Sequence, residues 1–356
     1  MGDKVVVAMS GGVDSSVAAL LLKRQGYGVI GVTMQIWPQP DDRSKACCSL
    51  EAVGDARKVS WDLGIPHYVL NFRDEFEDKV IRYFCREYIQ GRTPNPCIAC
   101  NRYIKFESLL AKARGIGAEY IATGHYARII REEKTNEYML YTGVDSTKDQ
   151  SYALYSMTQH QLAHTLFPLG NLTKEKVREI AREAGLPVSD KPDSQEICFV
   201  SDDNYAGFVE EYLDVEAQEG EIRSVSGEYL GTHKGVYHYT VGQRKGLGLA
   251  LGHPVYVTKV DPRKGLVWVG GDKDLFSKGL VASDFNYISG TPFEEGKRVQ
   301  AKIRYASVKA GAVAYPDGGS VKIEFQEPQR AVAPGQAVVL YDGQRVLGGG
   351  TIEYGY

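Results

Sequence analysis

The sequence predicts an α/β domain built on a parallel sheet, followed by a small central β domain and a C-terminal β-barrel. In the first half, short apolar runs alternate with helical stretches that stop at glycine, which is typical of strand–helix units on a parallel sheet. After about residue 204 the helical periodicity fades, and short alternating segments rich in glycine replace it. The chain has 356 residues, which is too long for one ordinary core, so several domains are expected.

The first half is predicted to contain four strands, a hairpin and six helices. The strands are expected at residues 5–9, 29–34, 67–71 and 120–123, and the hairpin at 128–130 with 138–141. The helices are expected at 15–24, 51–63, 74–88, 106–113, 159–166 and 173–184. Ligands of such sheets bind at the carboxyl ends of the strands, so the Gly11-Gly12 loop, Met34 and Gly124-His125 are expected on one rim.

The second half is predicted to be all β, with strands at 236–241, 255–260, 267–269, 299–303, 321–325 and 337–340. The boundary between two β domains is expected within residues 273–279. The predicted division is therefore 1–203 for the α/β domain, 204–275 for the central domain and 276–356 for the barrel.

Composition narrows the class of protein. Apolar residues make up 43% and charged residues 24%, as in globular proteins, and no apolar run is long enough to cross a bilayer. The chain opens directly into a strand, so a cytoplasmic setting and no membrane partner are expected. There the six cysteines would be reduced, and so metal-binding, catalytic or buried. The net charge of −3 means that any nucleic-acid surface must be a local patch.

The most informative motif is Ser-Gly-Gly-Val-Asp-Ser at residues 10–15, directly behind an apolar strand and at the start of a helix. Paired glycines allow a tight turn, and the free N–H groups of a helix start suit a phosphate. The motif is neither the common P-loop nor the Gly-x-Gly-x-x-Gly turn. It resembles the Ser-Gly-Gly-x-Asp-Ser loop of ATP pyrophosphatases, which cleave ATP between its α- and β-phosphates. The alternative is an ordinary glycine-rich turn.

Cysteines form the second constellation. Cys97 and Cys100 make a Cys-x-x-Cys pair, predicted to lie in a proline-rich loop between two helices, and Cys198 is the third candidate. Such a pair in a reducing compartment indicates metal binding or redox chemistry. Three thiolates suit an iron–sulfur cluster with one open iron, or a persulfide relay, better than a closed zinc site. The alternative is three unrelated cysteines.

Other candidates have weaker signals. Cys85 is predicted to pack in the core, and Cys47-Cys48 to be ordinary residues before a helix. His125 lies on the predicted rim, where a structural and a functional role are about equally expected. Basic and aromatic residues mix at 233–246 and 297–305, where they could meet RNA or form a solvated β-face.

Together these segments resemble the tRNA-specific 2-thiouridylase family, whose members place sulfur on the wobble uridine of certain tRNAs. The resemblance covers nearly the whole chain and is carried by residues 8–15, 91–96, 122–127, 148–152, 191–199 and 239–246. It implies an adenine nucleotide alpha-hydrolase-like domain before the two β domains. It also implies ATP with Mg²⁺, a tRNA anticodon loop as partner, and a sulfur-donor protein or inorganic sulfide.

The resemblance also implies roles for individual residues. ATP binding would fall on Ala8, Met9, Ser10, Gly11, Gly12, Val13, Asp14, Ser15, Met34 and Gly124. Contact with the tRNA would fall on Asn95, Pro96 and Cys97, facing the target base, and on His125, Lys148, Asp149, Gln150, Arg304, Tyr305 and Gln336. Cys100 matches the family's nucleophile, and Cys198 matches its persulfide carrier.

One position departs from the common pattern, because Cys97 stands where many members have Asp. This makes the site similar to that of iron–sulfur thiouridylases, and it predicts a [4Fe–4S] cluster held by Cys97, Cys100 and Cys198. Two alternative functions stay open. Another ATP pyrophosphatase, such as an amide-forming synthetase, needs the loop but not the cysteines. A non-catalytic metal- and RNA-binding module explains the cysteines but not the loop.

Overall fold

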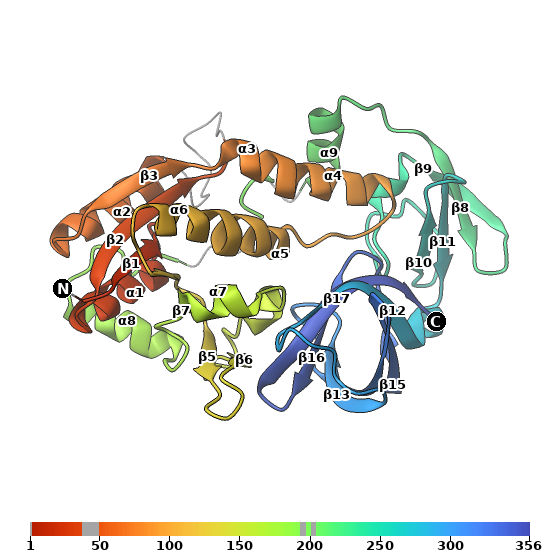
Figure 1. The fold of residues 1–356 in the computed structure, drawn as a ribbon. Helices are drawn as coiled ribbons and strands as arrows, with labels where there is room; N and C mark the ends of the chain where they lie inside the picture. The colour runs from red at the N-terminus through yellow and green to blue at the C-terminus, as the bar shows by residue number, and fades with distance from the viewer. Residues whose placement is uncertain (1, 38–49, 193–196, 201–203) are drawn as a thin grey trace.

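The computed structural model describes residues 2–37, 50–192, 197–200 and 204–356. The predicted fold class is confirmed. An α/β domain is followed by a small four-stranded sheet and then by a β-barrel, which lie side by side in Figure 1. The predictions for Cys47 and Cys48, and part of the segment before Cys198, fall outside the described residues.

The parallel sheet of the first domain has the strand order β3-β2-β1-β4-β7. Its strands are β1 (Lys4–Ala8), β2 (Gly28–Gln35), β3 (His67–Asn71), β4 (Tyr120–Ala122) and β7 (Thr165–Leu166). Both faces are covered, because Val5 and Val7 pack in one core cluster and Val6 in another. This follows from the alternation of side chains along a strand, and it explains why the strand reads as a continuous apolar run.

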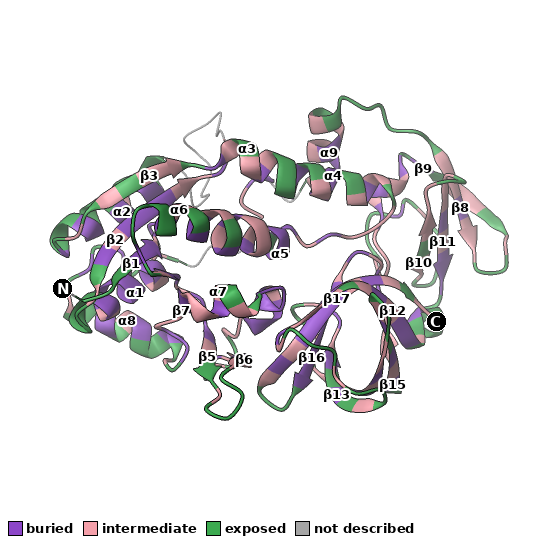
Figure 2. Ribbon diagram, viewed as in Figure 1, coloured by how far each residue is buried: buried purple, intermediate pink, exposed green. Residues whose placement is uncertain are grey.

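Helices cover both faces of this sheet and bury the side that faces it (Figure 2). One cluster joins the sheet to α1 (Val13–Arg24), α2 (Leu50–Asp62) and α8 (Lys174–Glu183). The opposite cluster is formed with α3 (Arg73–Phe76), α4 (Arg82–Ile89) and α6 (Leu109–Gly115). The predicted helix 74–88 is present as α3 and α4, joined by the π-helical turn η1 (Glu77–Ile81). No helix of the described ranges is long and apolar enough to cross a membrane.

The prediction that the Cys-x-x-Cys pair lies in a loop is wrong. A helix begins at α5 (Pro96–Ala99) and continues through the π-helical stretch η2 (Cys100–Ser108) into α6. The Asn95 side chain accepts hydrogen bonds from the N–H groups of Cys97 and Ile98, and Pro96 occupies the first helical position. Asparagine as the cap followed by proline is a strong start for a helix. It places the cysteine pair on the first turn of that helix.

The predicted helix 159–166 is shorter than expected. It is α7 (Gln159–Ala163), and the next residues form the edge strand β7, which pairs with Ile121 and Ala122. The backbone oxygens of His164 and Leu166 accept hydrogen bonds from the N–H groups of Ile121 and Thr123, so this segment is paired with the open edge of the sheet.

The barrel contains a hairpin from the first domain. Its strand order is β12-β15-β14-β13-β16-β17-β6-β5, and β12 also pairs with β17 to close it. The hairpin strands β5 (Ala127–Arg131) and β6 (Tyr138–Thr142) join this sheet where Tyr141 pairs with Arg345. The barrel strands are β12 (Phe276–Tyr287), β13 (Lys297–Lys302), β14 (Ala310–Asp317), β15 (Ser320–Arg330), β16 (Ala337–Asp342) and β17 (Arg345–Gly355).

The central sheet has the order β10-β11-β8-β9 and follows helix α9 (Tyr205–Leu213). Its strands are β8 (Gly220–Ser224), β9 (Tyr229–His233), β10 (Tyr256–Asp261) and β11 (Leu266–Gly270). The predicted strand 236–241 is wrong, since Val236–His238 is a 3₁₀ turn. The side chains of Tyr237 and His238 both reach the carboxylate of Glu210, at 3.0 and 3.1 Å. A strand would point these neighbours to opposite faces.

Candidate active site

The predicted phosphate loop has the expected strand–turn–helix form. Gly11 has φ +70°, and a Cβ there would lie 2.3 Å from the carbonyl oxygen of Ala52. The Ser15 hydroxyl accepts a hydrogen bond from the N–H of Ser10 and donates one to the carbonyl of Gly12, both at 3.2 Å. The loop is thus held closed by its own hydroxyl, while the first N–H groups of α1 have no partner within the helix. Such an arrangement suits a phosphate.

The rim predicted from the strand ends is present. β2 and β4 flank β1, so Met34 near the end of β2 and Gly124 just after β4 lie on either side of the loop. A Cβ on Gly124 would lie 2.8 Å from backbone atoms of Asp14 and Ser15. The absence of a side chain at Gly124 therefore allows the chain after β4 to approach the start of α1 closely.

Two residues beside the loop were not singled out from the sequence. Lys174 forms an ion pair with Asp14 at 2.7 Å, and the hydroxyl of Tyr126 donates to the same carboxylate at 2.7 Å. Tyr126 lies in a segment that carries the family resemblance, but no local pattern marks Lys174. Its role becomes visible only when α8 packs against α1.

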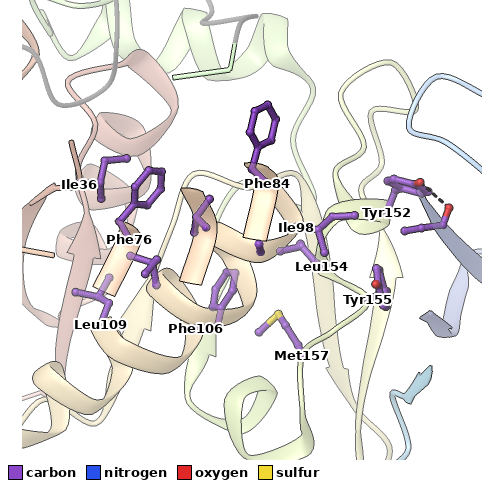
Figure 3. Close-up of a cluster of buried hydrophobic side chains, with 14 of the residues drawn as sticks. Ile36, Phe76, Phe84, Ile98, Phe106, Leu109, Tyr152, Leu154, Tyr155 and Met157 are labelled. Carbon is purple, nitrogen blue, oxygen red and sulfur yellow. Dashed lines mark hydrogen bonds between the residues drawn. The ribbon is translucent and has the colours of Figure 1, made fainter. Parts of the chain in front are cut away.

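The thiols have different surroundings. Cys97 is exposed on the first turn of the helix that begins with α5, whereas Cys100 and Cys198 are partly exposed and pack against one apolar cluster. Phe199, next to Cys198, makes edge or tilted contacts with three aromatic rings of that cluster at 5.2–5.7 Å. Figure 3 shows the cluster, in which Ile98, the residue after Cys97 in the sequence, lies beside Leu154. Cys85 is fully buried as predicted, and burial raises the pKa of its thiol to about 12.

The described residues do not form the metal site that was predicted on three thiolates. Within the described residues, no group of three His, Cys, Asp or Glu side chains could hold a metal ion. The structure therefore gives no support to a [4Fe–4S] cluster on Cys97, Cys100 and Cys198, and the cluster stays a prediction. Asp14 is the carboxylate next to the expected phosphates, so a Mg²⁺ ion accompanying ATP fits the loop better.

The barrel brings aromatic and basic side chains to the cysteine helix. The Tyr305 hydroxyl donates to the backbone oxygen of Asp149 at 3.2 Å. The pKa of Tyr305 is raised, mainly by burial and further by the charges of Asp149 and Cys97, while Lys148 lowers it. The N–H of Thr93 donates to the backbone oxygen of Pro334 at 2.8 Å, so the segment that leads into the cysteine helix lies against the barrel. The ammonium of Lys302 lies 5.4 Å from the centre of the Tyr305 ring. A cation and an exposed ring beside a thiol can contact RNA phosphate and base.

Several predicted contact residues have structural partners. Gln336 donates from its amide to the backbone oxygen of Thr93 at 3.0 Å, which ties the barrel to the segment before the cysteines. Gln150 accepts from the N–H of Tyr126, and Asp149 accepts from the N–H groups of Gly143 and Ser151.

Two further residues predicted to contact the tRNA, Arg304 and His125, also contact other residues of this chain. Arg304 donates to the backbone oxygen of Arg330. His125 is only 9% exposed, packs against Phe106 and Phe167, and has its pKa lowered well below 6.5 by burial, with Lys105 adding to the effect. The imidazole of His125 is therefore buried among these groups, and its role in tRNA contact stays a prediction.

Fold and site define a nucleotide-binding α/β enzyme of the ATP pyrophosphatase class. Residues 3–202 match the family described as "tRNA methyl transferase HUP domain", 206–271 match its "PRC-barrel domain", and 277–352 match the "Aminomethyltransferase beta-barrel domain". "tRNA-specific 2-thiouridylase MnmA" of Acetivibrio thermocellus is 57% identical over 98% of this chain and 99% of its own. The protein of that name in Clostridioides difficile is 53% identical, over 99% of both chains. The chain therefore belongs to the tRNA-specific 2-thiouridylase family.

The solved structures that match this chain have lower sequence identity to it. A 4-thiouridine synthetase–RNA complex with bound ATP is 20% identical, with a TM-score of 0.38, over 60% of this chain and 50% of that one. NMN synthetase from Francisella tularensis is 21% identical, with a TM-score of 0.35, over 60% and 76%.

Proposed function

We propose that this enzyme uses ATP to replace the 2-oxygen of the wobble uridine of tRNA with sulfur, releasing AMP and pyrophosphate. The observation that carries the proposal is the meeting of two elements. The segment that leads into the cysteine helix is hydrogen-bonded at Thr93 to Pro334 and Gln336 of the barrel, which also carries Tyr305 and Lys302, and the same chain has a phosphate loop. A thiol site beside an RNA-facing surface is what base thiolation requires, and the target base must leave its stack to reach it.

The first chemical step activates the uridine. Its O2 forms a bond to the α-phosphorus of ATP, the bond from that phosphorus to the bridging oxygen breaks, and pyrophosphate leaves. Residues 8–15, Met34 and Gly124 are proposed to hold the nucleotide, with the N–H groups at the start of α1 directed at its phosphates. A Mg²⁺ ion bound with ATP would neutralise phosphate charge, and Asp14 is the carboxylate placed to hold it.

The second step transfers sulfur. A persulfide on Cys198, loaded by a sulfur-donor protein or from inorganic sulfide and an oxidant, is proposed to attack C2 through its terminal sulfur, and AMP leaves with the former O2. The Cys100 thiolate then attacks Sγ of Cys198, the sulfur–sulfur bond to the base breaks, and a Cys100–Cys198 disulfide forms. A dithiol reductant restores both thiols.

Six residues of the barrel edge, the cysteine helix and the loop at Lys148 are proposed to contact the tRNA. Asn95, Pro96 and Cys97 would face the base, while Lys148, Arg304 and Tyr305 would meet the backbone of the anticodon loop. His125, Asp149, Gln150 and Gln336 would support this surface mainly through the contacts described above. We also propose the domain division 1–203, 204–275 and 276–356 and a cytoplasmic location.

The test is AMP release with and without unmodified tRNA. The proposal predicts tRNA-dependent AMP from the wild type, none from Asp14→Asn, and tRNA binding retained by that variant. AMP release that ignores tRNA would favour an amide-forming synthetase, and no AMP at all would favour a non-catalytic RNA-binding module.

The route of sulfur needs a separate test, because a [4Fe–4S] centre on Cys97, Cys100 and Cys198 is the alternative. Anaerobic purification with iron and sulfide analysis is paired with a Cys97→Asp variant. The thiol route predicts that Cys97→Asp thiolates tRNA fully when charged with persulfide, whereas Cys198→Ala does not. Iron bound by the wild type, together with inactivity of Cys97→Asp, would establish the cluster instead.

A further inference from the structure

A largely buried ion pair stands at the phosphate loop. The ammonium of Lys174 lies 2.8 and 2.7 Å from the two carboxylate oxygens of Asp14, and the Lys174 side chain is only 11% exposed. Both partners are held by further contacts. The Tyr126 hydroxyl donates to Asp14 at 2.7 Å, and the backbone N–H of Lys174 donates to Asp145 at 2.9 Å. The charge of Lys174 is therefore fixed against the first turn of α1.

Stability alone is a poor reason for this pair. Removing an ammonium from water is costly, and a buried ion pair is often no more stabilising than apolar side chains of the same size. The position of the pair is more informative. Asp14 lies where the phosphates of ATP are expected, and its carboxylate would repel them if it were unpaired.

The loop has no positive charge of its own. Residues 8–16 contain neither lysine nor arginine. Lys174 comes from α8, 160 residues further along the chain, and α8 packs directly on α1. A lysine ammonium is a compact charge that binds phosphate oxygens well, and a carboxylate is a usual ligand of Mg²⁺. The Asp14–Lys174 pair thus offers one partner for the phosphates of ATP and one for its metal.

We propose that Lys174 is a phosphate-binding residue of the nucleotide site, and that its ammonium exchanges the Asp14 carboxylate for the phosphates when ATP and Mg²⁺ enter. The inference rests on the proposed use of ATP and adds a residue to it. In the nucleotide-free enzyme the pair keeps the loop neutral. In the complex, Lys174 would contact the negative phosphates of ATP and Asp14 would contact the Mg²⁺ ion.

The experiment compares binding of a non-hydrolysable ATP analogue with binding of adenosine, which has the same base and ribose but no phosphate. Lys174→Met should weaken binding of the analogue about tenfold or more, which is about 1.4 kcal/mol, and leave adenosine affinity unchanged. Lys174→Arg should retain most of the affinity. Lys176→Met is the matched control, because Lys176 is exposed on the same helix and pairs with Glu179; it should bind both ligands normally.

A double variant separates phosphate binding from neutralisation of Asp14 and from a folding defect. Asp14→Asn with Lys174→Met leaves no unpaired charge, so it should fold as Asp14→Asn does, as checked by thermal unfolding. If Lys174 binds phosphate, the double variant binds the analogue about tenfold more weakly than Asp14→Asn alone. Equal affinity of these two variants, or an equal loss of analogue and adenosine binding in Lys174→Met, overturns the inference. A wild type that binds no ATP analogue would refute the proposed function itself.

Discussion

Gly124→Ala is expected to damage the nucleotide site through one methyl group. The new Cβ would lie 2.8 Å from the carbonyl carbon of Asp14 and from the nitrogen of Ser15, whereas ordinary contacts begin at 3.4 Å. The end of β4 and the start of α1 must therefore separate by about 0.6 Å. Because the obstructing atoms are backbone, they cannot rotate away, and the cost should be roughly 1–3 kcal/mol, as for other overpacked sites.

The functional loss should exceed the loss of stability. A shift of about 1 Å at a reacting centre can cost about a hundredfold in rate, so tRNA-dependent AMP release should fall by about tenfold or more. The melting temperature should fall by roughly 2–4 °C for each kcal/mol. Gly54→Ala is the matched control, since a Cβ there meets nothing within 4 Å in the helix α2; it should be neutral or stabilising by up to about 1 kcal/mol. Normal AMP release and melting of Gly124→Ala would refute the packing argument.

Three further substitutions test other parts of the structure. Asn95→Ala removes the N-terminal cap of the cysteine helix and should lower the free energy of unfolding by about 1 kcal/mol. Because the first helical turn would then open more often, Cys97 should be alkylated faster, and an unchanged alkylation rate would contradict the capping role. Arg304→Ala should weaken tRNA binding and reduce the slope of log affinity against log salt by about one; an unaltered slope would remove Arg304 from the interface. The pKa of Glu353 is raised by burial, but hydrogen bonds, chiefly from Arg92, bring it below its ordinary value of 4.5. The ion pair between Glu353 and Arg92 therefore stabilises the fold fully above pH 4.5, and this stabilisation disappears as the pH falls through the lowered pKa. Glu353→Gln should therefore lower stability in urea unfolding near neutral pH, and the difference from wild type should shrink on acidification; a difference independent of pH would count against this ion pair.

Much of the architecture was predictable because the relevant interactions are local. The apolar run of β1 indicates a strand buried on both faces, and the paired glycines and Ser15 indicate the turn and helix start that follow. Asn95 as a cap followed by Pro96 is likewise a local pattern that indicates the start of a helix. The loop prediction there gave too much weight to Pro94 and Pro96 as breakers of regular structure.

Other failures came from tertiary contacts. The turn at Val236–His238 has the apolar alternation of a strand, but Glu210 of α9 draws two neighbouring side chains to one side. The last residues of the predicted helix 159–166 became β7 because an open sheet edge was beside them. Neither Glu210 nor that edge is close in sequence to the segment that it changes.

The sequence by itself determined the phosphate loop, the strand–helix alternation and the identity of the thiols, because backbone conformation and chemical type depend on neighbouring residues. Only the tertiary structure decided which charges meet. It set Lys174 against Asp14 and the barrel residue Gln336 against Thr93, and it left the three cysteines without a metal-binding arrangement within the described residues. Such pairings depend on how helices and sheets pack across more than a hundred residues, and no local pattern encodes that distance.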